Sequence, residues 1–393
     1  MTSELLVNLL AAGIAFLVGV TSRSTHGWLK RKRALAHEAE SRIRRHPRYS
    51  ADWLIRYYRR RGADKDLYVA DHGSRRQVVP FLTKPSWYAD GLVESIVDQQ
   101  VPHELSAVPV DTKVLAARGR YLAVEDEGGE PWNELLACAA GVTEDGSGPR
   151  VRLVLARYFQ YLSACGPIED ETYAAIAKPS RATPLRDRVL PDVDVAARCS
   201  RGAHAFGMQV ATVFDTGGRH VVLIQRRSFA VSIYGGALAV VPVFGCQSVD
   251  LSERTPVSLF HNYLREVYEE LYGGVEVQRR GTRVDPTWFY REAPIARLLA
   301  ARERGDLEFT LLGFGFDALN AEMDLCALAY VSDRRYAEEE IAVMTTNWEI
   351  QDIAIHDLWG SELTDLMLAG EFSPGSVFTL ARAREVLADR RHA

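Results

Sequence analysis

The sequence predicts an α/β (α+β) fold, with a mixed sheet and at least two helices over residues 201–393. One observation favours this class, and a second indicates a folded chain. Short runs rich in β-branched and aromatic residues alternate with longer segments of helical periodicity, and Gly- or Pro-containing turns separate many of them. Hydrophobic residues at 47% and charged residues at 25% are ordinary for a folded chain. A third observation sets the N-terminus apart, because an apolar run is followed there by a strongly basic segment.

Residues 1–22 are predicted to form a transmembrane helix. The stretch 5–20 is apolar except for Asn8. Extended to residue 22, it makes a helix of about 27 Å at 1.5 Å per residue, which is just enough to span a bilayer. No Lys or Arg precedes the run, whereas Arg23 and the "KRKR" of 30–33 follow it. The positive-inside rule then places the N-terminus outside and all later residues in the cytoplasm. A buried or interfacial helix is the alternative.

Residues 23–62 are predicted to be a basic, helical, juxtamembrane linker. From Arg23 to Arg61 the chain has thirteen Lys or Arg and three acidic residues. Trp53, Tyr57 and Tyr58 are interleaved with these cations, a pattern that single-stranded nucleic acid can also use. Beside a transmembrane helix, contact with anionic lipid head groups and aromatic anchoring at the interface are favoured. We therefore expect membrane lipid as a partner, and no nucleic acid.

The five cysteines are scattered, odd in number and without a C-x-x-C pair: Cys138, Cys165, Cys199, Cys246 and Cys326. This usage indicates reduced core residues of a cytoplasmic protein. A disulfide framework or a zinc site is not expected.

Residues 63–195 are predicted to be an α+β region of unknown role. "LYVADHG" and "RQVVPFL" are typical of short strands. "GPRVRLVLARYFQYLSACG" is either a strand running into a helix or one helix ended by Gly166 and Pro167. The region contains no recognisable chemical motif, and Asp64, His72 and His103 are isolated.

Residues 201–393 show a sharper pattern of elements. "MQVATVF", "DTGGR" and "HVVLIQRR" predict a hairpin, and "ALAVVPVFG" predicts a third strand buried on both faces. "SLFHNYLREVYEELYGG" predicts a helix with Pro256 near its first turn and Gly273 and Gly274 at its end. The later stretches "LEFTLLGFGFDA", "DLCALAYVS" and "NWEIQDIAIHDL" predict strands, and "SPGSVFTLARAREVLADRR" predicts a closing helix.

The helix around residue 266 carries a cluster of acidic side chains. Glu266, Glu269 and Glu270 fall at i, i+3 and i+4, on the side opposite an apolar stripe, and Arg265 can reach Glu269 at i+4. A solvated helix face explains this pattern, since like charges at this spacing cost only tenths of a kcal/mol. Carboxylates converging from one rigid element are also what Mg²⁺ needs. The stripe consists of Leu264, Val267, Tyr268 and Leu271.

The stretch "REVYEE", residues 265–270, resembles the Nudix box, and the order of elements around it is similar to that of a Nudix domain. The family pattern is Gly, any five, Glu, any seven, then Arg-Glu-aliphatic-any-Glu-Glu-any-Gly-aliphatic. Three positions depart from it: Leu251 and Val257 stand where the first Gly and the first Glu belong, and Tyr272 stands at the last Gly. The resemblance covers about residues 201–390 and implies a Nudix-like domain over 201–393, which would be a sandwich of a mixed sheet between helices.

The resemblance implies a site. In the family the three matched glutamates bind a divalent metal that polarises a diphosphate, so Glu266, Glu269 and Glu270 are the candidate metal ligands for Mg²⁺ or Mn²⁺. With Arg265 they are also the candidate catalytic residues. The run Glu338 to Glu340 offers distal carboxylates, although such a run is usually a solvated face. Base stacking by residues 288–290 is less expected than core packing.

Two functions remain open from the sequence. The first is a membrane-anchored sensor that binds a nucleotide or nucleoside-diphosphate derivative without turnover, with oligomerisation as one output. This architecture resembles effectors of bacterial nucleotide-signalling defence. The second is an active, Mg²⁺-dependent Nudix hydrolase that cleaves a nucleoside diphosphate linked to another moiety. The lost Gly and Glu favour the sensor, while the intact Arg-Glu and Glu-Glu pairs favour the hydrolase. A scaffold whose region 64–190 is the functional part is a minor third hypothesis.

Overall fold

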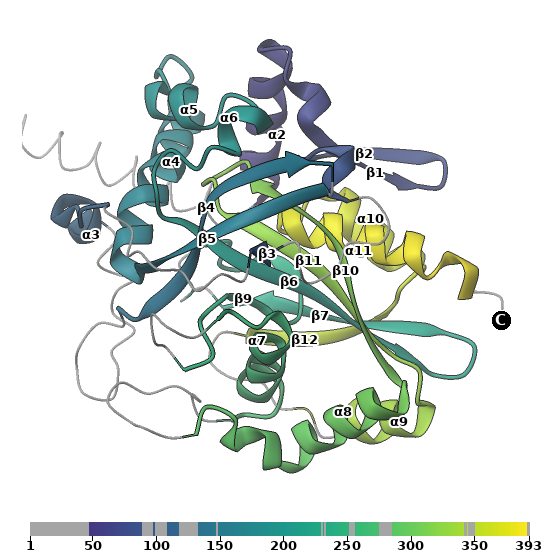
Figure 1. Cartoon of the computed structure of the whole chain (residues 1–393). Coiled ribbons are helices and arrows are strands. Elements are labelled where there is room, and N and C mark those ends of the chain that lie inside the picture. The colour runs from purple at the N-terminus through teal and green to yellow at the C-terminus, as the bar shows by residue number, and fades with distance from the viewer. Residues whose placement is uncertain are drawn as a thin grey trace, which may run out of the picture.

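The fold is seen in a computed structural model (Figure 1), in which the termini and several connections are not described. The transmembrane helix expected at 1–22 lies outside the described residues, as does the first part of the juxtamembrane segment. Within the described part of the chain, no helix is long and apolar enough to cross a membrane. The structure describes residues 47–88, 97–98, 108–117, 133–146, 148–228, 231, 233–250, 256–274, 285–341, 344 and 350–390.

Two parallel strands lie at the centre of the sheet. β6 (His204–Asp215) pairs with β11 (Met323–Val331) in a register that runs from Phe206 opposite Met323 to Phe214 opposite Val331. β10 (Leu307–Asp317) continues the sheet antiparallel to β11. The expected mixed sheet is therefore confirmed, and its centre is a parallel pair whose strands are more than 100 residues apart in the chain.

The expected hairpin is confirmed, and the strand that follows it is divided. β7 (His220–Arg227) pairs with the end of β6 and, on its other edge, with β12 (Ile350–Asp357). The single strand expected at "ALAVVPVFG" is two, β8 (Leu238–Val240) on β7 and β9 (Val243–Gly245) on β6. Pro242 lies between them, and a proline has no N–H to give to a strand ladder.

Helices cover both faces of the sheet. Successive side chains of β6 point to opposite faces, as in any strand. Met208 and Val210 belong to one hydrophobic core together with Leu264 of helix α7 (Leu259–Glu266). Ala211 belongs to a second core together with Phe378 of helix α11 (Pro374–Val386). The expected sandwich of a sheet between helices is thus observed.

The start of α11 approaches the two central strands closely. The Gln209 amide of β6 donates to Asp324 Oδ2 of β11 at 2.6 Å and accepts from the Ser376 hydroxyl at 2.6 Å. A methyl group added at Gly375 would collide with the Gln209 side chain and lie 2.6 Å from Asp324 Oδ2. A glycine at 375 is therefore needed for this contact between helix and sheet.

The region 63–195 extends the same sheet. The hairpin of β1 (Leu67–His72) and β2 (Arg75–Leu82) is as expected, and β2 pairs with β10. At the other side, β4 (Leu135–Asp145) pairs with β6 and with β5 (Gly148–Arg157). Of the two alternatives after residue 148, a strand running into a helix is observed. Helix α4 (Tyr158–Ala177) continues through Gly166 and Pro167.

The basic linker contains a helix that packs on the protein. In α2 (Pro47–Arg60) Tyr58 is fully buried and donates to the Leu190 carbonyl at 2.8 Å, while Tyr57 donates to Asp187 at 2.7 Å. The expectation that Tyr57 and Tyr58 anchor the chain in lipid is wrong, because these rings fill the protein core. Arginines occupy much of the exposed face of α2, including Arg56, Arg59 and Arg60.

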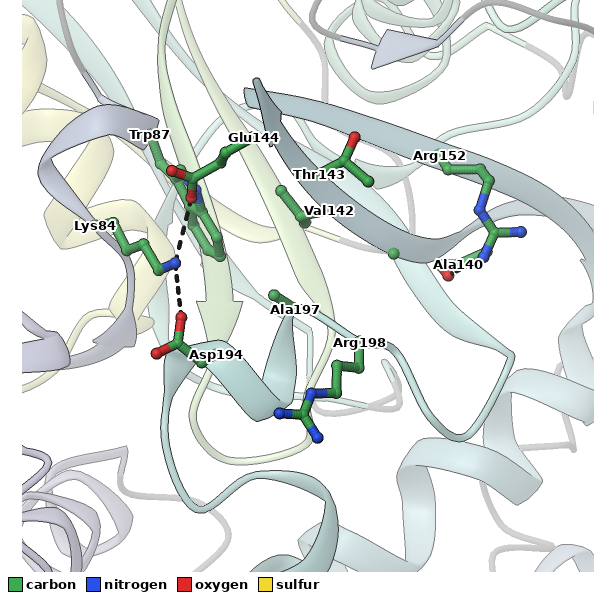
Figure 2. A pocket seen from close by; sticks show the side chains of 11 residues that line it. Lys84, Trp87, Ala140, Val142, Thr143, Glu144, Arg152, Asp194, Ala197 and Arg198 are labelled. Atoms are coloured by element: carbon green, nitrogen blue, oxygen red, sulfur yellow. Dashed lines mark hydrogen bonds and ion pairs between the residues drawn. The ribbon is translucent and has the colours of Figure 1, made fainter. Parts of the chain in front are cut away.

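A pocket of about 480 Å³ opens beside β4 and β5, next to the short helix α6 (Val193–Ala196) (Figure 2). Charged side chains line it, among them Lys84, Arg152 and Arg198. None of these residues belongs to the glutamate helix, that is, α7 and the turn Val267–Leu271 that continues it, which carry Glu266, Glu269 and Glu270.

The close approach at Gly375 can be tested by one methyl group. Gly375→Ala should destabilise the protein by about 1–3 kcal/mol, because an overpacked side chain forces its neighbours to move. Equilibrium urea unfolding followed by fluorescence gives the free energy of unfolding.

The matched control for this test is Gly146→Ala in the turn between β4 and β5. A Cβ atom there would have no neighbour within 4 Å, so the free energy of unfolding should change by less than about 0.5 kcal/mol. Equal effects of the two substitutions would contradict the packing described at the start of α11.

Candidate functional site

The glutamate helix begins one turn later than its first proline suggests and changes type at its middle. Ser258 caps α7 by accepting from the His261 N–H at 3.3 Å. The α-helix ends at Glu266 and continues as a π-helical turn, η4 (Val267–Leu271). Bonds from i to i+5 widen that turn, so the i, i+3, i+4 register of an α-helix is not kept through it.

The three glutamates are not on a solvated face. Glu266 is 9% exposed and Glu270 is 2% exposed, while Glu269 is half-buried. The apolar stripe is confirmed at Leu264, which is buried in the core. A solvated helix face, one of the two explanations open from the sequence, is therefore wrong for Glu266 and Glu270. The carboxylates of Glu266 and Glu270 are therefore packed against the rest of the protein.

Arg265 holds Glu266 and not Glu269. The buried guanidinium donates from Nε to Glu266 Oε1 at 3.1 Å, and Nη2 forms an ion pair with the same oxygen. Its Nη1 donates to the side-chain oxygen of Gln247. Burial alone would lower the pKa of Arg265, but the charges of Glu266 and Glu269 outweigh it and raise that pKa. The i+4 pair expected with Glu269 is therefore replaced by a buried pair between sequence neighbours.

Asn262 and Arg265 together fasten the segment after β9 to the helix. Asn262 is fully buried; its side-chain oxygen accepts from the Gln247 N–H at 2.9 Å and its Nδ2 donates to the Gln247 carbonyl at 2.8 Å. The sequence patterns did not reveal Asn262 or Gln247 as part of the site. An amide on the buried side of an otherwise apolar helix is the one signal that points to Asn262, and nothing in the sequence points to Gln247.

These placements decide how the site fits a metal ion. Within the described residues no three His, Cys, Asp or Glu side chains gather so as to hold one. Arg265 occupies Oε1 of Glu266, and the three glutamates do not converge on one point in this structure. Glu269 and Glu270 remain as candidate ligands, and Mg²⁺ is often held by one or two carboxylates together with a ligand's phosphates.

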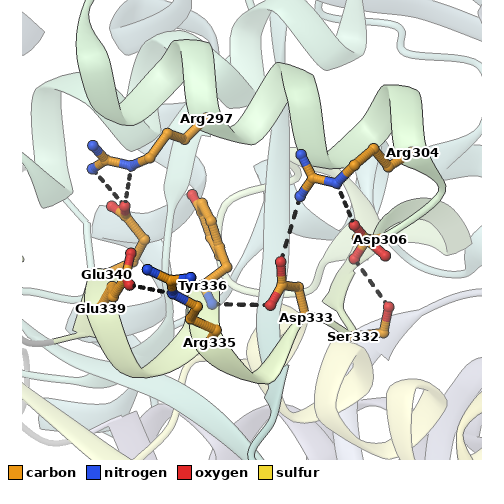
Figure 3. A network of polar contacts seen from close by, with 9 residues as sticks. All are labelled: Arg297, Arg304, Asp306, Ser332, Asp333, Arg335, Tyr336, Glu339 and Glu340. Atoms are coloured by element: carbon orange, nitrogen blue, oxygen red, sulfur yellow. Dashed lines mark hydrogen bonds and ion pairs between the residues drawn. The ribbon is translucent and has the colours of Figure 1, made fainter.

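The distal carboxylates have structural partners (Figure 3). Glu340 is buried and accepts from Arg297 Nε at 2.5 Å, so it joins helix α9 (Arg334–Ile341) to helix α8 (Ala293–Arg304). It also accepts from the Tyr272 hydroxyl at 2.6 Å, which joins α9 to the end of the glutamate helix. Glu339 is exposed and paired with Arg335, as expected of a solvated face. Tyr272, at the position of the family's last Gly, thus has a defined contact.

The aromatic residues after the helix pack against His261 in its first turn and against Tyr268 in its π-helical turn. Phe289 is fully buried, in agreement with the expected core packing. Trp288 and Tyr290 are half-buried, and the Tyr290 hydroxyl lies 2.9 Å from His261 Nδ1. Desolvation, with a smaller contribution from the charge of Arg265, lowers the pKa of His261 to about 4. His261 is therefore neutral at physiological pH.

A pair of buried acids that no sequence motif marks lies where β10 ends and β11 begins. Asp317 accepts from the Tyr234 hydroxyl at 2.8 Å and from the Leu319 N–H at 2.7 Å. Desolvation, then the charge of Asp324, raises the pKa of Asp317 to about 7. Desolvation raises the pKa of Asp324 to about 6, although the hydrogen bond from Gln209 opposes the shift.

Comparisons with known proteins bear on this geometry only weakly. No protein-family model matches the chain, and no curated protein matches it. Part of the chain is similar to the solved Nudix domain of Shewanella oneidensis NrtR complexed with ADP ribose, at 14% identity over 47% of this chain and 89% of that one, with a TM-score of 0.29. It is similar to the Nudix hydrolase RenU from M. smegmatis at 16% identity over 47% and 86%, with a TM-score of 0.26.

A third similar structure is a bifunctional NMN adenylyltransferase/ADP ribose pyrophosphatase from Francisella tularensis, complexed with AMP and Mn ion. The identity is 9% over 63% of this chain and 55% of that one, and the TM-score is 0.28. Similarity at this level carries no argument about what this chain binds or does. Its function has to be inferred from its own residues.

The buried ion pair can be tested by a double-mutant cycle. Arg265→Met leaves the Glu266 carboxylate without its partner in a poorly solvated place, and breaking such a pair costs about 3–5 kcal/mol. The double variant Arg265→Met/Glu266→Met should lose clearly less than the sum of the single variants, because it leaves no unpaired charge. Additive losses in free energy of unfolding would mean that the two side chains do not interact.

The buried acids predict a pH dependence of stability. The folded pKa of Asp317, about 7, is above the unfolded value of about 3.9, so the folded state keeps a proton that the unfolded chain releases. The stabilisation is complete below about pH 4 and is lost as the pH rises through 7. Relative to wild type, Asp317→Asn should therefore become progressively more stable between pH 5 and 8, by about 2–3 kcal/mol across that window. Parallel urea-unfolding profiles of the two proteins would contradict the raised pKa.

Proposed function

We propose that the chain is a sensor that binds a nucleotide or nucleoside-diphosphate derivative at the glutamate helix and does not turn it over efficiently. The observation that carries the proposal is the buried pair between Arg265 and Glu266. It withdraws one carboxylate from the acidic cluster of a motif that resembles the Nudix box, while Glu269 stays half-buried beside it.

Binding and turnover place different demands on this helix. A hydrolase must hold water in line with a phosphorus atom, and misplacement by about 1 Å can cost a hundredfold in rate. Binding requires only that charge and shape match. A divalent cation held by Glu269 and Glu270 would neutralise the ligand's phosphates, and this is the chemistry that it would supply. Engagement of Glu266 by Arg265 and the π-helical turn alter the geometry on which turnover depends, and leave such a binding role intact.

Sensing also requires an output. A ligand shifts an equilibrium between two states by its difference in affinity for them. We propose that the N-terminal segment supplies the output, with residues 1–22 as a single-pass anchor, the N-terminus outside and the described region cytoplasmic. Contact of residues 23–62 with lipid and ligand-dependent homo-oligomerisation are parts of this proposal. The exposed arginines of α2 support the lipid contact.

The alternative is an active, metal-dependent hydrolase of a nucleoside diphosphate linked to another moiety. Its support is that Arg265, Glu266, Glu269 and Glu270 all occupy positions of the motif and lie within one helix. In this alternative the Arg265–Glu266 pair opens when the substrate binds. The two functions differ in one measurable quantity, the rate at which a bound diphosphate is cleaved.

The test measures binding and turnover on the same full-length protein in detergent. ADP-ribose should bind in the micromolar range or tighter by calorimetry, more tightly with Mg²⁺ than with EDTA. Chromatography of the products should show turnover far below the ordinary range of about 1–1000 per second. Glu269→Gln should remove most of the gain in affinity that Mg²⁺ gives.

The matched control is Glu339→Gln, an exposed glutamate of α9 that is paired with Arg335. It should bind ADP-ribose as wild type does, with and without Mg²⁺. Fast cleavage that Glu269→Gln abolishes would establish the hydrolase instead. Absence of binding by a panel of nucleotides would reject both functions and direct attention to region 64–190.

A further inference from the structure

The pocket beside β4 and β5 has a fixed frame. Lys84 lies between two carboxylates, with its Nζ 3.3 Å from Glu144 Oε1 and 2.7 Å from Asp194 Oδ1 (Figure 2). The buried indole of Trp87 donates to Glu144 Oε1 at 2.6 Å. These contacts join the segment after β2, the end of β4 and helix α6, so the walls of the pocket are held together by ion pairs.

The negative charges of the pocket are already satisfied. Desolvation acts to raise the pKa of Glu144, but hydrogen bonds from Trp87 and Lys84 outweigh it and lower that pKa. The hydrogen bond from Lys84 lowers the pKa of Asp194. Both acids are therefore ionised at neutral pH and directed at the ammonium group of Lys84.

Unlike Lys84, the two arginines of the pocket are not held between carboxylates of the described residues. Arg152 of β5 uses one N–H, from Nη2 to the Ala140 carbonyl at 2.6 Å. Arg198 follows α6 and lines the same pocket. Within the part of the chain that the structure describes, neither guanidinium has an ion-pair partner within 4.0 Å. A guanidinium has five N–H donors, and a phosphate or carboxylate can accept two of them at once.

The backbone at the pocket is shaped to leave this space open. The register of β4 on β5 shifts between Ala139 and Gly141, and Gly141 has a φ of +152°. A residue with a side chain would be strained in that conformation, so a glycine, which adds no side chain to the pocket, stands at position 141. The Val142 N–H is taken by the Ala197 carbonyl at 2.8 Å, which fixes the strand to the segment that carries Arg198.

We propose that this pocket is a second binding site, for a small ligand that carries two phosphate or carboxylate groups, and that Arg152 and Arg198, which extend from different sides of the pocket (Figure 2), each bind one of these groups. A volume of about 480 Å³ lies within the range of roughly 300–1,000 Å³ typical of small-molecule sites. Three cations line it against two carboxylates, and both carboxylates are engaged by Lys84. The site shares no residue with the glutamate helix and does not depend on the proposed function.

The experiment titrates the full-length protein with inorganic pyrophosphate and, separately, with malonate, in EDTA, and measures binding by calorimetry. Pyrophosphate represents a phosphate-bearing ligand and malonate a carboxylate-bearing one. Binding of either anion should weaken at least tenfold in Arg152→Gln/Arg198→Gln. Arg198→Gln alone should lose part of the affinity. Arg152→Lys should also lose part, because an ammonium group keeps the charge but not the planar fork.

The matched control is Arg188→Gln, an exposed arginine of helix α5 (Pro184–Val189) outside the pocket. It should bind the anions as wild type does, and so should Glu269→Gln, which alters the glutamate helix alone. Unchanged midpoints of thermal unfolding show that the variants are folded. The proposal is overturned if neither anion binds wild type, or if Arg188→Gln weakens binding as much as the double variant. Failure of the nucleotide test leaves this result unaffected.

Discussion

The parallel pairing of β6 with β11 is the constraint on which the rest of the structure depends. It brings together two segments more than 100 residues apart and places one strand, β6, beside β4, β7, β9 and β11. Because the side chains of β6 alternate, the same strand supports α7 through one core and α11 through the other. The close contact of Gly375 with Gln209 and Asp324 then fixes α11 on that pair.

The glutamate helix shows how buried charge is used for positioning. Taking Arg265 and Glu266 out of water costs free energy that their attraction only partly returns, so such a pair is weak evidence for stability. Here the pair and Asn262 hold Gln247 from the segment after β9. Their joint effect is to fix where that segment meets the helix. The stretch that resembles the Nudix box therefore also supplies a polar contact that holds the segment after β9 against the helix.

Much of the fold could be predicted from local patterns, and most of the site could not. The hairpins, β10, β11, β12 and the closing helix follow from period-two runs, turn residues and a Ser-Pro start. The split at Pro242 was also open to prediction, since proline lacks an N–H. No local pattern specifies that Glu266 is buried against Arg265, which also contacts Gln247, or that Glu270 is buried in a π-helical turn. In the same way, Tyr57 and Tyr58 lie in a basic, aromatic stretch that is typical of membrane anchors. Their hydrogen bonds to Asp187 and Leu190, far away in the chain, show that they belong to the protein core.

The two proposed sites are joined by adjacent strands. Cys138 and Ala139 of β4, next to the pocket, pair with β6, and β6 pairs with β9, which leads to the residue that Arg265 holds. Close-packed strands transmit a displacement without absorbing it. Coupling between sites still needs an element with two arrangements. The bulge at Gly141 and the π-helical turn at 267–271 lie at the two ends of this path. At both places the backbone hydrogen bonds depart from the regular pattern of a strand or an α-helix. A change of register at either end would be such a second arrangement.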